Sequence, residues 1–158
     1  MLALALSWVG DLCLLSASKT PFLVGIGAFL FAHIAFAVAF SRQPSATETL
    51  WVTLPLLALL GAFVLRWLWP HLRGFFRGAV VAYVAAIVAM AALAIGASLG
   101  GSHWTLAVGA LMFAVSDVSV ARDRFVREAI VNRVWGLPLY YGAQVLLAWS
   151  CATVLASG

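Results

Sequence analysis

The sequence has 158 residues, of which 65% are hydrophobic and 9% are charged, and nine Lys and Arg against five Asp and Glu give a formal net charge of +4. So little polar surface cannot cover a water-soluble globule of this size. The composition therefore excludes a soluble enzyme and a basic nucleic-acid-binding domain, and it indicates one membrane domain.

Backbone groups inside a bilayer must find partners within the protein, and the long apolar runs lack the two-residue alternation of barrel strands. The sequence therefore predicts an all-α, polytopic transmembrane bundle of about six helices. The expected segments, taken along the chain, are residues 1–15, 21–40, 49–67, 78–97, 103–121 and 134–156. The first run lacks a basic leader region and carries an acid, so we expect it to belong to the mature protein.

Basic residues predict the orientation of these segments. The connections after the first, third and fifth segments hold Lys19, Arg66, Arg73, Arg77, Arg122, Arg124, Arg127 and Arg133. The opposite face has Arg42 alone. By the positive-inside rule, the first face is expected to be cytoplasmic and both termini outside, in the plasma or inner membrane.

Two acidic residues lie inside apolar segments, where an ionisable side chain is costly and indicates a functional site. Asp11 and Asp117 each precede the basic end of their segment by about four residues, or roughly 6 Å at 1.5 Å per residue. We therefore expect both at one depth. In a dry pocket, one carboxyl group stays protonated as an acid and the other is ionised as a base, which suits a hydrolase. Alternatively, each acid hydrogen-bonds a neighbouring helix or extends toward the headgroups.

Other polar side chains inside the segments are candidates to line the same pocket. They are His33 in the second segment, Ser116 beside Asp117, and Tyr140 and Gln144 one turn apart in the sixth. Such residues also hold membrane helices together, so a structural role is the competing interpretation. No metal site is predicted, because His71 and His103 are expected on opposite faces of the membrane.

A charged loop directly follows the segment that carries Asp117. Its charged residues are Arg122, Asp123, Arg124, Arg127, Glu128 and Arg133. Such loops ordinarily contact solvent and lipid headgroups. Its position also allows an arginine, with Arg122 as the candidate, to hold a substrate phosphate beside the acids.

Two ordered stretches of the sequence carry a distinctive combination of motifs. The first is SWVGDLCLLSASKTPFLVGIGAFLFAHIAFAVAFSR, with its Gly-Asp, its Gly-Ala-Phe and the following His and Phe. The second is GALMFAVSDVSVARDRFV, followed by YYGAQVLLAWS, with its Ser-Asp and its Tyr before Ala-Gln. Together they cover about half of the chain and resemble the two signatures of the YhhN family of lysoplasmalogenases.

The resemblance implies an integral membrane enzyme that hydrolyses the vinyl ether bond of lysoplasmalogens to a fatty aldehyde and a glycerophospho-base. It places the acids at Asp11 and Asp117, with a lysophospholipid and bilayer lipids as partners. Protonation of the alkene gives an oxocarbenium ion that water attacks, so two carboxyl groups suffice without a metal or organic cofactor. Family members usually carry about two further helices before the Gly-Asp motif, so residues 1–158 are expected to form a single transmembrane domain without them.

Two other functions fit the same residues. Paired intramembrane acids also suit a small proton-coupled carrier. A non-catalytic lipid-binding membrane protein would bind a lysolipid without releasing an aldehyde. Neither motif distinguishes which aspartate is the general acid.

Overall fold

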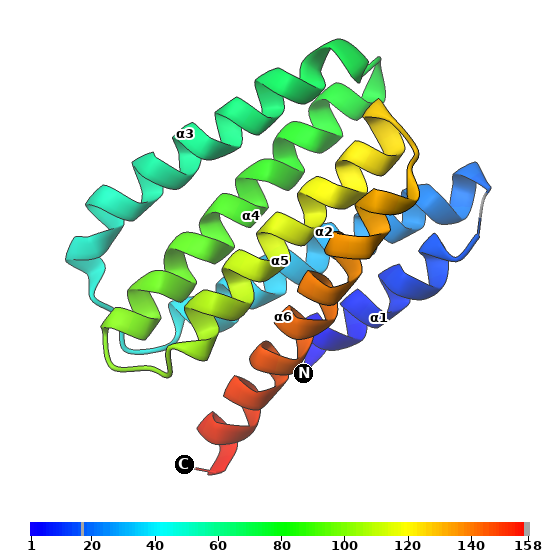
Figure 1. Ribbon diagram of the computed structural model, residues 1–158. Helices are drawn as coiled ribbons and strands as arrows, with labels where there is room; N and C mark the ends of the chain where they lie inside the picture. Colours follow the sequence, from blue (N-terminus) through cyan, green and yellow to red (C-terminus); the bar gives the residue numbers. More distant parts are fainter. Residues whose placement is uncertain (17, 157–158) are drawn as a thin grey trace.

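A computed structural model describes residues 1–16 and 18–156, and every regular element in this part of the chain is helical (Figure 1). The six α-helices are α1 (Leu2–Leu14), α2 (Lys19–Ser41), α3 (Leu50–Leu68), α4 (Phe75–Leu99), α5 (Thr105–Ala121) and α6 (Ile130–Ala156). Short turns of helix flank α3 as η1 (Thr47–Thr49) and η2 (Trp69–His71), and a π-helical turn, η3 (Arg122–Val126), extends α5. Each expected segment coincides with one helix to within four residues at either end, which confirms the all-α bundle.

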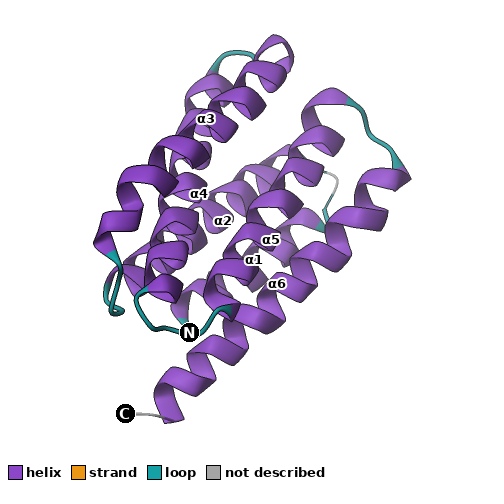
Figure 2. Ribbon diagram, turned by 60° about the vertical axis from the view of Figure 1, so that its left-hand side comes forward, coloured by secondary structure: helices purple, strands orange, loops and turns teal. Residues whose placement is uncertain are grey.

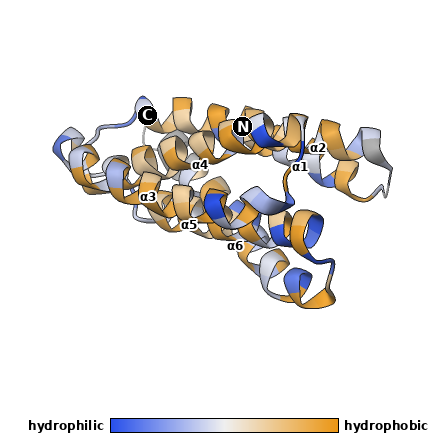
Figure 3. Cartoon of the chain, turned by 90° about the horizontal axis from the view of Figure 1, so that it is seen from above, coloured by the Kyte–Doolittle hydropathy of each residue, from blue (hydrophilic) through white to orange (hydrophobic). Residues whose placement is uncertain are grey.

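The outer surface of the bundle is apolar. Four stretches are long and apolar enough to cross a membrane, namely Thr20–Ser41, Thr47–His71, Phe75–Leu99 and Thr105–Val126. Helix α1 is shorter, with 13 residues, whereas the 27 residues of α6 suffice by length. Large side chains such as Trp51 and Phe63 are 85% and 71% exposed, and hydrophobic residues dominate the helices in Figure 3. Such a surface suits lipid rather than water, so the chain is a membrane protein.

Helices α1, α2, α4, α5 and α6 enclose the core, and α3 packs on the outside of this bundle. Helix α1 packs on α2, α2 on α4, α4 on α5 and α5 on α6, whereas α3 packs mainly on α4 at the outside (Figures 1 and 2). None of the most hydrophobic stretch of α3 is buried inside the bundle. The core combines large and small side chains, among them Phe36, Met90, Ala94, Phe113 and Leu147. The small residues allow the helices to approach closely, as is typical inside membranes.

The connections sort to two ends of the bundle. The turns that join α1 to α2, α3 to α4 and α5 to α6 lie together at one end, and the two chain ends lie at the other (Figure 1). Eight of the nine Lys and Arg residues are in or next to the first set of turns. We refer to this end as the basic end.

Candidate active site

Asp117 of α5 faces His33 of α2. The Oδ2 atom of Asp117 lies 3.0 Å from Nε2 of His33, and these side chains are 11% and 0% exposed. On the other side of the ring, Nδ1 lies 2.6 Å from the main-chain oxygen of Phe29. Despite the short distance, His33 Nε2 and Asp117 Oδ2 do not form a well-aligned hydrogen bond, and neither has another partner in the described part of the chain. The pair thus presents two buried polar atoms whose hydrogen-bonding capacity is not filled within the described part of the chain.

Asp11 of α1 has a different partner. The hydroxyl of Tyr140, in α6, donates a hydrogen bond of 2.8 Å to Asp11 Oδ2. This contact links the first helix to the last, and it holds one carboxylate oxygen in a fixed direction. Tyr140 thus satisfies one acceptor position of the Asp11 carboxyl group and fixes its orientation.

A layer of aromatic rings joins the two acids into one site. Phe113 is fully buried, and the centre of its ring lies 4.6 Å from that of His33 and 5.4 Å from that of Tyr140. Phe29 contacts Phe113 and Tyr140 edge to face. The Tyr140 hydroxyl, already bonded to Asp11, also interacts electrostatically with Asp117. Because these rings are buried, charges beside them act on each other more strongly than at a surface.

Gly10 allows helix α1, which carries Asp11, to pack closely against Phe29 of α2. A Cβ atom on Gly10 would lie 2.6 Å from Cε2 of Phe29, closer than carbon atoms approach. The Phe29 ring is 7% exposed and is held by its contacts with Phe113 and Tyr140. Only glycine therefore allows α1 to lie this close to α2, with Asp11 next in the chain. This explains the Gly-Asp pair in physical terms.

Tyr83 of α4 also belongs to the site, and it was not among the residues predicted from the sequence. Its ring centre lies 5.2 Å from that of His33, and its hydroxyl interacts with the Asp117 side chain. One feature of the sequence could have identified Tyr83 as a site residue. Tyrosines of membrane helices concentrate near the interfaces, whereas Tyr83 lies well inside its helix.

The remaining predicted residues have separate positions. The buried Ser116 hydroxyl donates to the Phe113 main-chain oxygen in its own helix. Gln144 neighbours the Tyr140 hydroxyl, but its buried amide nitrogen has no well-formed hydrogen bond within the described part of the chain. Arg122 begins η3, and its side chain makes no ion pair with either acid among the described residues. Their roles in binding remain predictions.

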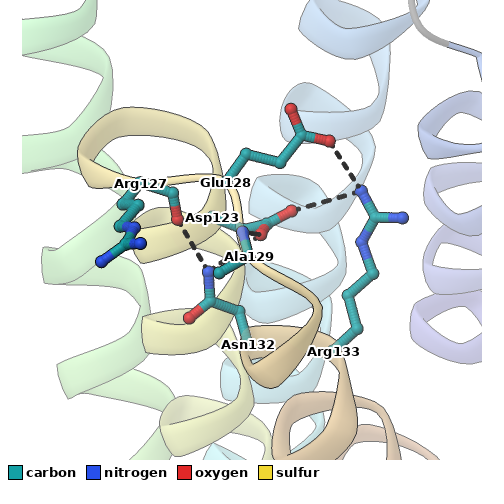
Figure 4. Close-up of polar contacts among 6 residues, drawn as sticks. All are labelled: Asp123, Arg127, Glu128, Ala129, Asn132 and Arg133. Atoms are coloured by element: carbon teal, nitrogen blue, oxygen red, sulfur yellow. Dashed lines mark hydrogen bonds and ion pairs between the residues drawn. The ribbon is translucent and has the colours of Figure 1, made fainter.

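A second polar cluster lies at the basic end. Arg133 Nη2 lies 3.5 Å from Asp123 Oδ2 and 3.2 Å from Glu128 Oε1, and Asn132 Nδ2 donates to Asp123 Oδ1 at 2.8 Å (Figure 4). The cluster borders a cavity of about 270 Å³, which we call the mouth pocket. Its lining residues are Asp123, Arg124, Phe125, Val126, Arg127, Glu128 and Arg133. Both signs of charge therefore line one pocket at the basic end of the bundle.

The arrangement suits proton transfer. Asp117 with His33, and Asp11 with Tyr140, are each close enough for a proton to pass between partners, and the Tyr83 ring lies beside His33. Within the described part of the chain, no three His, Cys, Asp or Glu side chains are placed to share a metal ion.

Comparison with known proteins gives a consistent set of matches. The sequence profile of the YhhN family matches residues 1–151. "Lysoplasmalogenase TMEM86A" of Bos taurus is 34% identical over 153 residues, covering 93% of this chain and 62% of the relative. "Lysoplasmalogenase" of Mycobacterium tuberculosis is 35% identical over 152 residues, covering 92% and 57%, and "Lysoplasmalogenase TMEM86B" of Sus scrofa is 37% identical over 149 residues, covering 94% and 61%. The chain thus spans about three fifths of the length of these relatives. No solved structure matches it significantly.

Proposed function

This chain belongs to the YhhN family, and on that basis we propose that it is a membrane hydrolase that cleaves the vinyl ether bond of lysoplasmalogens. The observation that carries the proposal is the aromatic layer that joins two carboxyl groups with different partners, Asp117 with His33 and Asp11 with Tyr140. Acid cleavage of a vinyl ether needs one group that gives a proton and another that accepts one from water.

The proposed reaction uses no group beyond these side chains. A proton is added to the alkene carbon remote from the ether oxygen, and the adjacent carbon becomes an oxocarbenium ion. Water adds to that carbon and loses a proton to a carboxylate, which gives a hemiacetal. The hemiacetal then breaks its bond to the glycerol oxygen and releases the fatty aldehyde and the glycerophospho-base. The acids are the proposed catalytic residues, and a carboxylate beside the cation stabilises its charge.

The decisive experiment measures aldehyde. We expect residues 1–158, purified in detergent, to release a fatty aldehyde from a lysoplasmalogen and none from a lysophospholipid with an ordinary ester chain. A matched protein, extended upstream to the length of the relatives, is assayed in parallel. Binding of lysolipid without aldehyde release by either protein would favour a lipid-binding protein, and proton-coupled uptake into vesicles would favour a carrier.

We also propose that the mouth pocket binds the substrate headgroup, with arginine facing the phosphate and acids facing the amine. Arg133 is 60% exposed and Glu128 79% exposed, so their ion pair adds little stability and its loss leaves the fold intact. We expect Arg133→Gln to raise KM about tenfold with kcat unchanged, as for a group that binds substrate and transition state equally. Arg73→Gln, at the same end but outside the pocket, is the control; equal KM values for both variants would contradict this role.

The proposed orientation places the basic end in the cytoplasm and the opposite end outside. It is tested by thiol labelling at position 124 after Cys13 and Cys151 have been replaced by serine. A membrane-impermeant thiol reagent added outside intact cells is expected to leave Arg124→Cys unlabelled until the membrane is opened. Labelling before that step would reverse the orientation.

A further inference from the structure

The two nitrogens of His33 face two oxygen atoms, and this arrangement fixes where protons lie. The Phe29 main-chain oxygen, 2.6 Å from Nδ1, can only accept a hydrogen bond. Nδ1 must therefore carry hydrogen. In a neutral imidazole Nε2 then carries a lone pair, and it faces Asp117 Oδ2 at 3.0 Å.

A proton must also lie between His33 and Asp117. Without one, two lone-pair atoms would face each other at 3.0 Å, in side chains that are 0% and 11% exposed. Such a contact is repulsive, and it would also bury a net negative charge. With one proton the pair is neutral overall, either as carboxylic acid and imidazole or as carboxylate and imidazolium. In either form the pair holds one proton that a general acid can transfer.

Asp11 has no imidazole partner among the described residues. Its Oδ2 receives a hydrogen bond of 2.8 Å from the Tyr140 hydroxyl, which is a donor toward a carboxylate. The groups that face the other acid, Asp117, are His33 from α2 and Tyr83 from α4, with Tyr140 from α6 within electrostatic reach. Each acid thus has a tyrosine hydroxyl beside it, but among the described residues Asp117 alone is also paired with a base.

We propose that the His33–Asp117 pair is the general acid of the hydrolysis, that Asp11 is the base, and that His33 is the positioning residue that keeps the proton on the pair. This assignment rests on the proposed function. It distinguishes the two aspartates, which the sequence motifs do not.

The proton balance closes over one turnover. The pair gives its proton to the alkene carbon, and Asp11 takes a proton from the attacking water. When the hemiacetal breaks down, Asp11 returns its proton to the departing glycerol oxygen, while the pair takes the proton of the hemiacetal hydroxyl. Substrate and water become aldehyde and alcohol, and both acids regain their starting states.

Deuterium exchange into the substrate separates the two roles. In D2O, Asp11→Asn retains the acid but lacks the base, so protonation at carbon reverses and deuterium accumulates at that carbon in recovered substrate. Asp117→Asn cannot protonate the carbon, and we expect it to introduce none. Mass spectrometry of the recovered lysoplasmalogen reads both results. Deuterium introduced by Asp117→Asn, or by neither variant, would overturn the assignment.

The double variant Asp11→Asn with His33→Gln tests the positioning role. We expect its deuterium incorporation to fall about tenfold to a hundredfold below that of Asp11→Asn alone, the range of general acid catalysis. Asp11→Asn with His71→Gln is the matched control, because His71 is exposed in η2. Equal incorporation in both double variants would remove His33 from the acid.

Nitrogen NMR of the histidines tests the proton positions without any turnover. The chain has three histidines, and the His33→Gln spectrum identifies the signals of His33. We expect Nδ1 of His33 to be protonated in the resting protein, with Nε2 altered in Asp117→Asn. An unprotonated Nδ1 would contradict the pair as a proton store. Failure of the proposed function would instead appear as no aldehyde from the wild-type chain, with the NMR result unchanged.

Discussion

Asp11→Asn and Asp117→Asn are each expected to lower kcat for aldehyde release at least about a hundredfold, the lower limit of what general acid–base catalysis contributes. Asparagine has nearly the same shape as aspartate, but it can neither give nor take the required proton. Because the two acids act in successive steps, the double variant should be only slightly less active than the less active of the two single variants.

The control for these variants is a carboxyl group outside the aromatic layer. Glu48 is exposed in η1, at the end of the bundle opposite the basic end, and we expect Glu48→Gln to keep wild-type activity. Helical content and thermal unfolding in detergent show whether each variant is folded. Wild-type turnover by folded Asp11→Asn and Asp117→Asn would contradict the two-carboxyl mechanism.

Tyr140→Phe is expected to lower kcat about tenfold to a hundredfold, because it removes the hydrogen bond that orients the Asp11 carboxyl group for proton transfer. The ring and its contacts with Phe29 and Phe113 remain. The loss therefore measures the hydrogen bond to Asp11 rather than packing. The assay is the same aldehyde release, with kcat and KM determined separately.

Tyr141→Phe provides the matched control, since Tyr141 is the next residue and is 57% exposed. It loses the same hydroxyl from a side chain on the outer surface. We expect its kcat to stay at the wild-type value. Equal losses in the two variants would mean that the Tyr140 hydroxyl has no special role at Asp11.

The sequence predicts the helices well because the bilayer leaves few choices. Backbone groups within lipid must bond inside their own segment, so hydrophobic length alone places a helix. The largest difference, four residues, is at the start of α6. There Asn132 and Arg133 interrupt the apolar run, whereas the structure uses both in the cluster around Asp123.

The site is less predictable, because its contacts join residues of different helices. Charge in an apolar run was sufficient to select Asp11 and Asp117 as candidates. Their partners depend on which helix faces which, and hydrophobicity carries no such information. Tyr83 was missed for that reason: its helix has no other marked feature near the site, and only the packing of α4 against α2 brings it to His33.

The position of α3 has a consequence for how much of the sequence specifies the fold. This helix packs mainly on α4 and buries none of its most hydrophobic stretch. Its outer side chains are exposed on the described part of the bundle, so packing within this chain does not distinguish leucine from valine or phenylalanine there. The identity of the apolar residues on that face therefore contributes little to specifying the fold of this chain. Substitutions among apolar residues at positions such as Leu59 and Phe63, which are 68% and 71% exposed, can accumulate there without reaching the acids.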